Sequence, residues 1–255
     1  MTRLVSVLVW IFVLLLVVVW VPLMAAVYVV TVPSDPGRYT VGRWFRRAAV
    51  IMVTVNPLWR FRTSGVHIAD PRRPYVAVSN HESVSDIFLI SHLPWEMKWL
   101  SKVEVFRIPF MGWMMRMAGD IGVSRGRATS RAQALEKIRD RLRKRVSVMV
   151  FPEGTRSPTN EMLPFREGAF RAAIEFGAPV LPMVVAGTRH AMVKGSLFFN
   201  RARAEVRVLE PVETAGMTLD DMPTLMADVR RRMEVARDVL RRELDGGGGR
   251  AGGGG

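Results

Sequence analysis

The stretch "VAVSNHESVSDIFLI", residues 76 to 90, changes character halfway along. Its first residues are mostly valine and alanine, which is typical of a buried strand, and its last residues have the composition of a short helix. The residues between them are polar: Asn80, His81, Glu82, Ser83, Ser85 and Asp86. A strand that turns directly into a helix is the repeating unit of an α/β sheet, and ligand sites tend to lie at such strand ends.

The same alternation continues along the chain. The patterns predict strands over 75–79, 97–102, 120–125, 146–151, 179–187 and 203–212. They predict helices over 86–93, 108–119, 128–143, 167–177 and 224–244, and the second of these is apolar enough to be buried. We therefore expect an α/β fold with a mixed, largely parallel sheet covered by helices. Residues 63–245 form the catalytic domain in this interpretation, and the glycine-rich tail 246–255 is expected to be disordered.

An uncharged stretch from Leu4 to Val32 precedes this domain. About 20 apolar residues are enough for a helix to cross a bilayer, so residues 1–36 are expected to be a transmembrane or membrane-embedded helix. A kink is expected at Pro22. A cleaved signal peptide is the alternative, but the apolar run is too long for one and no clear A-x-A site follows.

The charges around this helix predict its orientation. Only Arg3 precedes it, and four arginines follow it closely: Arg38, Arg43, Arg46 and Arg47. The positive-inside rule then places the domain on the cytoplasmic side of the inner (plasma) membrane. Residues 37–62 are predicted to be an interfacial amphipathic helix with its cations near lipid phosphates. Two alternatives stay open: a helix packed on the domain, and a hairpin of both segments that dips into one leaflet.

The overall composition narrows the class of partner. The 255 residues carry a formal charge of +14, from 37 Lys and Arg against 23 Asp and Glu. Such an excess favours a negatively charged partner: nucleic acid, an anionic bilayer or an acidic carrier protein. The basic helix over 131–145 is not accompanied by a zinc-finger, helix-turn-helix or RNP pattern, so no nucleic-acid partner is expected. The chain has no Cys, which excludes disulfides, thiolate metal sites and Cys nucleophiles.

His81 and Asp86 are the first candidate site residues. Across a turn into a helix, the carboxylate of Asp86 can fold back to a ring nitrogen of His81 and fix its tautomer. A histidine oriented in this way can take a proton from an alcohol. Alternatively, Asp86 only favours the helix N-terminus and His81 is a turn residue. The stretch alone supports both interpretations equally.

Three further polar clusters follow. Lys102, Arg107, Arg116 and Arg125 surround the predicted strand over 120–125 and are either anion ligands or solvated charges. The stretch "FPEGTRS", residues 151–157, places a guanidinium, a hydroxyl and glycine-freed amides in one turn, which can hold a phosphate. In the alternative, Glu153 and Arg156 simply pair with each other. The fourth stretch, "GAPVLPMVVAG" over 177–187, contains Pro182 and on its own is ordinary core.

The four stretches together are a more specific signal than any one of them alone. "NHESVSD" over 80–86, "GDIGVSRG" over 119–126, "FPEGTRS" over 151–157 and "APVLPMVV" over 178–185 occur in this order. The chain resembles the glycerolipid acyltransferase family, of the bacterial 1-acyl-glycerol-3-phosphate acyltransferase type, over residues 55–215. The H-x4-D pattern alone is weak, whereas its pairing with F-P-E-G-T-R-S is strong.

The resemblance implies a role for each matching residue. His81 would be the general base and Asp86 its orienting partner. Pro182 falls on a block that is linked to the acyl donor. Positions that the family uses for the acceptor's glycerol phosphate are Lys102, Arg125, Glu153, Gly154, Thr155 and Arg156. Val105 and the Arg166-Glu167 pair depart from the common pattern, which leaves the role of Arg166 open.

The reaction that the resemblance implies is transfer of a fatty acyl group to the sn-2 hydroxyl of 1-acyl-glycerol 3-phosphate, giving phosphatidic acid. Acyl-CoA or acyl-carrier protein would be the donor, with membrane lipids as partners, and no acyl-enzyme, cofactor or metal is expected. The same chemistry on a lyso-ornithine lipid, another lysophospholipid or glycerol 3-phosphate is the main alternative. A catalytically inactive scaffold and a basic protein that binds membrane surfaces or nucleic acid are alternatives of a different class.

Overall fold

The computed structural model describes residues 2–124, 128–193 and 195–246. These form one sheet of seven strands in the order β1-β7-β6-β2-β5-β3-β4. The strands are β1 (Trp59–Gly65), β2 (Val76–Ser79), β3 (Met97–Lys102), β4 (Ile121–Val123), β5 (Ser147–Val150), β6 (Val180–Ala186) and β7 (Ala202–Val208). Neighbouring strands run parallel, except that β6 and β7 are antiparallel. The predicted α/β class with a mixed, largely parallel sheet is therefore confirmed.

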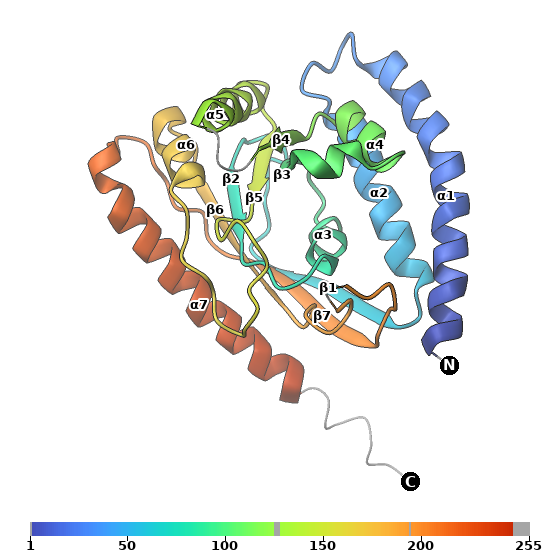
Figure 1. The fold of residues 1–255 in the computed structure, drawn as a ribbon. Coiled ribbons are helices and arrows are strands. Elements are labelled where there is room, and N and C mark those ends of the chain that lie inside the picture. The colour runs from blue at the N-terminus through green and yellow to red at the C-terminus, as the bar shows by residue number, and fades with distance from the viewer. Residues whose placement is uncertain (1, 125–127, 194, 247–255) are drawn as a thin grey trace.

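Helices cover both faces of this sheet (Figure 1). They are α1 (Thr2–Thr31), α2 (Tyr39–Val55), α3 (Ser85–Ile90), α4 (Met111–Ala118), α5 (Ala128–Arg143), α6 (Gly168–Phe176) and α7 (Met222–Gly246), with short 3₁₀ turns at Val103–Arg107 and Leu219–Asp221. Side chains alternate between the faces, so Val76 and Val78 of β2 pack with α5, α6 and α7, whereas Ala77 packs with α3. The central strands β2, β5 and β6 are buried at every position. Two-sided burial explains their nearly continuous apolar sequences.

One predicted boundary is wrong. Residues 37–62 were expected to form a single interfacial helix, but α2 ends at Val55 and residues 59–65 form β1, which pairs in parallel with β7. The sequence Asn56-Pro57 explains the difference, since a residue before proline is driven out of the helical conformation. Asn56 is extended, with φ −83° and ψ 104°.

The predicted buried helix over 108–119 is shorter than expected and buried on one side only. It is α4, and four large apolar side chains at its start are exposed: Ile108, Phe110, Met111 and Trp113. Its other face packs against the first two helices, through Met114 and Met115. Periodicity alone did not separate a buried helix from one that is apolar on its exposed side.

Helix α1 packs against the rest of the chain near both of its ends. Val9 lies in a cluster with Met52 of α2 and Phe199, and Met24 lies in a second cluster with Val41 of α2 and Met114 of α4. Figure 1 shows α1 beside α2 over most of its length. By length and composition α1 can cross a membrane. Its outer side exposes a row of large apolar residues: Leu4, Val7, Leu8, Ile11, Leu14, Leu15, Val18, Val19, Val29 and Val30.

Candidate active site

The site begins where β2 ends. Asn80, the first residue after Ser79, is buried, and its side-chain amide bonds to the main chain of Val185 in β6. The amide nitrogen donates to the Val185 carbonyl (3.0 Å), and the amide oxygen accepts from the Val185 N–H (2.8 Å). This pair of bonds fixes the turn to the neighbouring strand, so His81 emerges at the carboxyl edge of the sheet from a rigid base.

Asp86 is fully buried and accepts hydrogen bonds from four donors. Its Oδ2 accepts from His81 Nδ1 (2.8 Å), from the Glu82 N–H (2.8 Å) and from the Ser83 N–H (3.0 Å). Its Oδ1 accepts from the hydroxyl of Thr188, which follows β6. Both oxygens of Asp86 therefore act as acceptors, as the oxygens of a carboxylate do.

This carboxylate fixes the chemistry of the His81 ring. A carboxylate only accepts hydrogen bonds, so the proton of the neutral imidazole lies on Nδ1, and Nε2 is left as the acceptor. The His81–Asp86 contact is one of the two interpretations that residues 76–90 left open, and it is the one that the family resemblance implies. Phe151, the residue after β5, stacks on the His81 ring at 3.9 Å between centroids with an interplanar angle of 14°. The ring is therefore held both at its edge and on its face.

Glu153 lies where the sequence did not place it. It was predicted to contact the substrate or to pair with Arg156, but it is buried, and both of its oxygens accept from main-chain N–H groups. Oε1 accepts from the His81 N–H (2.8 Å) and Oε2 from the Leu163 N–H (2.8 Å). Burial raises the pKa of the Glu153 carboxyl, and these two hydrogen bonds oppose the rise. Glu153 thus holds the His81 turn against the segment that follows "FPEGTRS".

The glycine turn lies directly beside this brace. Gly154 has φ +69°, a conformation that favours glycine, and a Cβ atom there would lie 2.6 Å from Nε of Arg166. Thr155 is exposed and Arg156 is half-buried. The N–H of Ser157, next to Arg156, donates to the His81 carbonyl (2.9 Å). The glycine turn carries Arg156, and Arg166 lies against it. A backbone hydrogen bond therefore joins this turn to the turn that contains His81.

Lys102 and Pro182, two more of the predicted site residues, do not lie beside His81. Lys102 is exposed at the carboxyl end of β3, on the same edge of the sheet as His81. Pro182 is buried inside β6, where it pairs with Val78 of β2, so it belongs to the sheet interior. Arg125 lies outside the described residues. The structure thus brings His81 and Asp86 together with the 153–156 turn, and it does not bring Pro182 to their surface.

Comparison with known proteins shows which family this chain belongs to. A family model described as acyltransferase matches residues 60–186. The human protein named 1-acyl-sn-glycerol-3-phosphate acyltransferase alpha is 35% identical over 193 residues, which cover 74% of this chain and 67% of the human one. A Saccharomyces cerevisiae protein named 1-acyl-sn-glycerol-3-phosphate acyltransferase is 34% identical over 166 residues, which cover 64% of this chain and 55% of the yeast one. The chain belongs to the 1-acyl-sn-glycerol-3-phosphate acyltransferase family.

A solved structure agrees with the fold of this acyltransferase. The crystal structure of a 1-acyl-sn-glycerophosphate acyltransferase from Thermotoga maritima superposes with a TM-score of 0.72 at 22% identity, covering 94% of this chain and 99% of the other. The likeness includes the N-terminal helices, because almost the whole chain is covered. Family membership makes the chain an acyltransferase of phospholipid biosynthesis, and the exposed apolar side of α1 is consistent with membrane association.

Several residues of the acyltransferase site were missed from the sequence. Asn80, Phe151 and Thr188 each hold His81 or Asp86, and Arg189 donates to the carbonyls of Ser157 (3.0 Å) and Thr159. Their shared signal is position: each directly follows a predicted strand or lies within a few residues of its end. That signal identifies the edge of the sheet, but it does not say which side chains turn inward.

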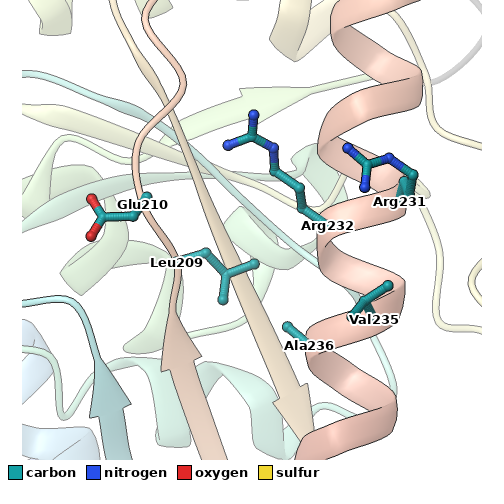
Figure 2. Close-up of a pocket in the computed structure, with 6 residues that line it drawn as sticks. All are labelled: Leu209, Glu210, Arg231, Arg232, Val235 and Ala236. Carbon is teal, nitrogen blue, oxygen red and sulfur yellow. The ribbon is translucent and has the colours of Figure 1, made fainter.

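Two further features concern metal binding and a cavity away from His81. Across the described ranges, no cluster of three or more His, Asp or Glu side chains is arranged to hold a metal ion. A hollow of about 320 Å³ lies between the end of β7 and α7, and its lining is shown in Figure 2. None of the predicted site residues lines it; its walls are Leu209, Glu210, Arg231, Arg232, Val235 and Ala236.

Proposed function

We propose that the chain transfers a fatty acyl group from a thioester donor, acyl-CoA or acyl-carrier protein, to the sn-2 hydroxyl of 1-acyl-glycerol 3-phosphate. The observation that carries this proposal is the His81–Asp86 pair, with Nδ1 held at 2.8 Å from a buried carboxylate. Such a pair suits removal of a proton from an alcohol. The names of the relatives support the choice of acceptor.

In the proposed mechanism, Nε2 of His81 takes the proton of the acceptor hydroxyl while the hydroxyl oxygen attacks the thioester carbonyl. The resulting tetrahedral oxyanion collapses, the carbon–sulfur bond breaks, and the imidazolium returns the proton to the departing thiolate. Asp86 stabilises the imidazolium without taking its proton. The acceptor itself is the nucleophile, so no acyl-enzyme forms. Proton transfer by a positioned side chain contributes about 10²- to 10⁴-fold to such a rate.

The phosphate of the acceptor would bind beside the glycine turn. Arg156 and Arg166 supply guanidinium groups there, and Thr155 adds an exposed hydroxyl. Guanidinium groups bind phosphate oxygens in a bidentate manner, and this supports a phosphate monoester as the acceptor headgroup. Lys102 would add positive charge from the next strand end. In this proposal Glu153 acts through the His81 turn and does not touch the lipid.

The acceptor would reach the site from the membrane. Helix α1 contacts the rest of the chain near both of its ends, so an α1 perpendicular to the bilayer would carry polar parts of the domain into the hydrocarbon. We therefore favour an α1 that lies along one leaflet, with its row of exposed Leu and Val side chains in the lipid. The arginines that follow α1 support the cytoplasmic leaflet of the plasma membrane, because its anionic lipids attract basic side chains near the surface.

A panel of acceptors and donors tests this proposal. The purified full-length protein, reconstituted in vesicles, is offered 1-acyl-glycerol 3-phosphate, glycerol 3-phosphate, a lyso-ornithine lipid and lysophosphatidylcholine, each with acyl-CoA and with acyl-carrier protein. We expect transfer to 1-acyl-glycerol 3-phosphate to be the fastest with at least one donor. A strong preference for an acceptor without a phosphate monoester would overturn the substrate assignment.

A further inference from the structure

Helix α7 lies outside the segment that matches the family model, yet it contacts the catalytic turns. Its apolar side, with Val229, Met233 and Leu240, packs on the sheet. Arg230, Arg237 and Arg241 are spaced seven and four residues apart, which places them within an arc of about 40° on the helix. All three reach the segment 157–163, which begins at the last residue of "FPEGTRS", and Figure 1 shows this segment running beside α7.

Arg230 holds the far end of this segment. Its guanidinium donates to the carbonyls of Leu163 (2.6 Å) and Met162 (2.8 Å). The N–H of Leu163 donates to Glu153, whose other oxygen accepts from the His81 N–H. A continuous series of hydrogen bonds therefore runs from α7 to the backbone of His81.

Arg241 reaches the site by a second and shorter route. One guanidinium nitrogen donates to the Asn160 carbonyl (2.8 Å), and the other lies 2.5 Å from Oε1 of Glu82. Glu82 is the residue after His81, and its N–H donates to the same oxygen of Asp86 that bonds the His81 ring. Only one residue, Glu82, thus lies between Arg241 and the Asp86 oxygen that orients the imidazole.

The charge of Arg241 also matters at this position. The Glu82 side chain is only 4% exposed and lies close to the carboxylate of Asp86. Burial and the charge of Asp86 both raise the pKa of Glu82, and Arg241 opposes them, with a smaller contribution from Arg189. If Arg241 is removed, a buried carboxylate loses its counter-charge next to a second carboxylate. Glu82 would then move or take up a proton, and either change disturbs the turn that carries His81.

We propose that Arg241 is a positioning residue for acyl transfer, and that α7 clamps the His81 turn and the 157–163 segment in the arrangement that the reaction needs. The inference rests on the proposed function only for the role of His81, and it does not depend on the identity of the acceptor. Because the apolar side of α7 packs on the sheet separately, we expect the helix to stay in place when Arg241 is replaced.

The test compares Arg241→Gln with Arg242→Gln, a matched control, because Arg242 is the adjacent, exposed arginine of the same helix. Both full-length variants are reconstituted in vesicles, and kcat and KM are measured for donor and acceptor. A small displacement of a catalytic group costs up to about 10²-fold in rate. We expect Arg241→Gln to lower kcat by at least about tenfold, with both KM values within about twofold of wild type. Arg242→Gln should behave as wild type.

Two further variants separate positioning from folding. Arg241→Lys keeps the charge opposite Glu82 but loses the fork that also reaches Asn160, so its kcat should lie between those of wild type and Arg241→Gln. Glu82→Gln combined with Arg241→Gln removes both charges, and we expect it to recover part of the lost kcat. If Arg241→Gln alone does not fold, the double variant is compared with Glu82→Gln instead, and we expect the two to have similar kcat values because Arg241 acts through the charge of Glu82.

Three results would overturn the inference: an Arg241→Gln enzyme with wild-type kcat, a loss confined to KM, or no recovery in the double variant. These results are distinguishable from failure of the proposed function. An inactive wild-type protein on 1-acyl-glycerol 3-phosphate would contradict the acceptor assignment, whereas an active wild type that is insensitive to Arg241 would contradict only the clamp.

Discussion

Two buried polar clusters lie along the same sheet and differ in how completely their atoms are paired. In the first, both oxygens of Asp86 accept hydrogen bonds, from four donors in total. In the second, Arg46 of α2 bonds to Asp120 at 2.6 Å and lies 3.8 Å from Glu96, while Glu96 pairs with the fully buried Lys98 at 3.0 Å. Three atoms of this cluster have no hydrogen-bond partner among the described residues: Arg46 Nε and Glu96 Oε2, which approach each other only to 3.8 Å, and Asp120 Oδ2.

The two clusters therefore have different tasks. A fully satisfied carboxylate holds one side chain, His81, in one orientation, as a reaction requires. The second cluster fastens α2 to the strands β3 and β4, and Lys98 also donates to the Arg38 carbonyl just before α2 (2.7 Å). Burial raises the pKa of Glu96 and lowers the pKa of Lys98, and each charge opposes the shift of the other. Changes in the first cluster should therefore affect the rate, and changes in the second should affect stability.

The largest expected effect comes from making the same substitution in both clusters. Asp86→Asn replaces an oxygen that accepts with an amide that donates, so the His81 tautomer is no longer fixed. We expect kcat to fall by at least about 10²-fold with little change in unfolding. Asp120→Asn should lower the denaturant midpoint instead, and the specific activity of its folded fraction should stay within about threefold of wild type. An Asp120→Asn enzyme that is folded but inactive would remove the distinction between the clusters.

Lys98→Met tests the second cluster by leaving Glu96 buried without its main counter-charge. Breaking a buried ion pair in this way costs about 3–5 kcal/mol of unfolding free energy. Denaturant unfolding in detergent measures this loss. Glu96→Leu combined with Lys98→Met removes both charges and should recover most of it, because apolar replacements of a buried pair are often neutral. A double variant as unstable as the single one would mean that the pair itself holds α2.

Substitution of Gly42 tests the packing of α2 against the second cluster. A Cβ atom at Gly42 would lie 2.1 Å from Oε1 of Glu96, so Gly42→Ala forces the cluster apart. We expect a loss of about 1–3 kcal/mol in unfolding free energy. Gly168→Ala in α6 is the matched control, because a Cβ atom there meets nothing within 4 Å. That control should be stabilising by about 0.4–1 kcal/mol, and a Gly42→Ala protein of equal stability would contradict close packing of α2 on Glu96.

The smallest effect is expected at an exposed pair. Arg73 and Glu213 approach to 2.6 Å, but their side chains are 45% and 60% exposed. Solvent screens such pairs, so Glu213→Gln should change the unfolding free energy by less than about 1 kcal/mol and leave kcat unchanged. A larger loss in thermal unfolding would show that distance, and not burial, decides the strength of these ion pairs.

The sequence predicted the α/β class from local patterns, whereas residues 76–90 alone left the His81–Asp86 contact open and the family resemblance favoured it. Strand and helix periodicity are local, and His81 is only five residues from Asp86. The missed contacts join distant parts of the chain: Glu153 bonds a backbone N–H 72 residues away, and Arg241 bonds Glu82 across 159 residues. Spacing in the sequence carries no signal for such pairs. Arg46 was expected near lipid phosphates because its charge was visible, whereas its buried partners Glu96 and Asp120 were not.

The central claim is that His81 is the general base of acyl transfer, and the rate of the His81→Ala variant tests it most directly. The full-length variant is reconstituted in vesicles, its fold is checked by circular dichroism, and release of free CoA or carrier-protein thiol is followed with 1-acyl-glycerol 3-phosphate as acceptor. The account predicts that kcat falls by at least about 10²-fold while the protein remains folded. A folded His81→Ala enzyme that transfers acyl groups within a few-fold of the wild-type rate would contradict it.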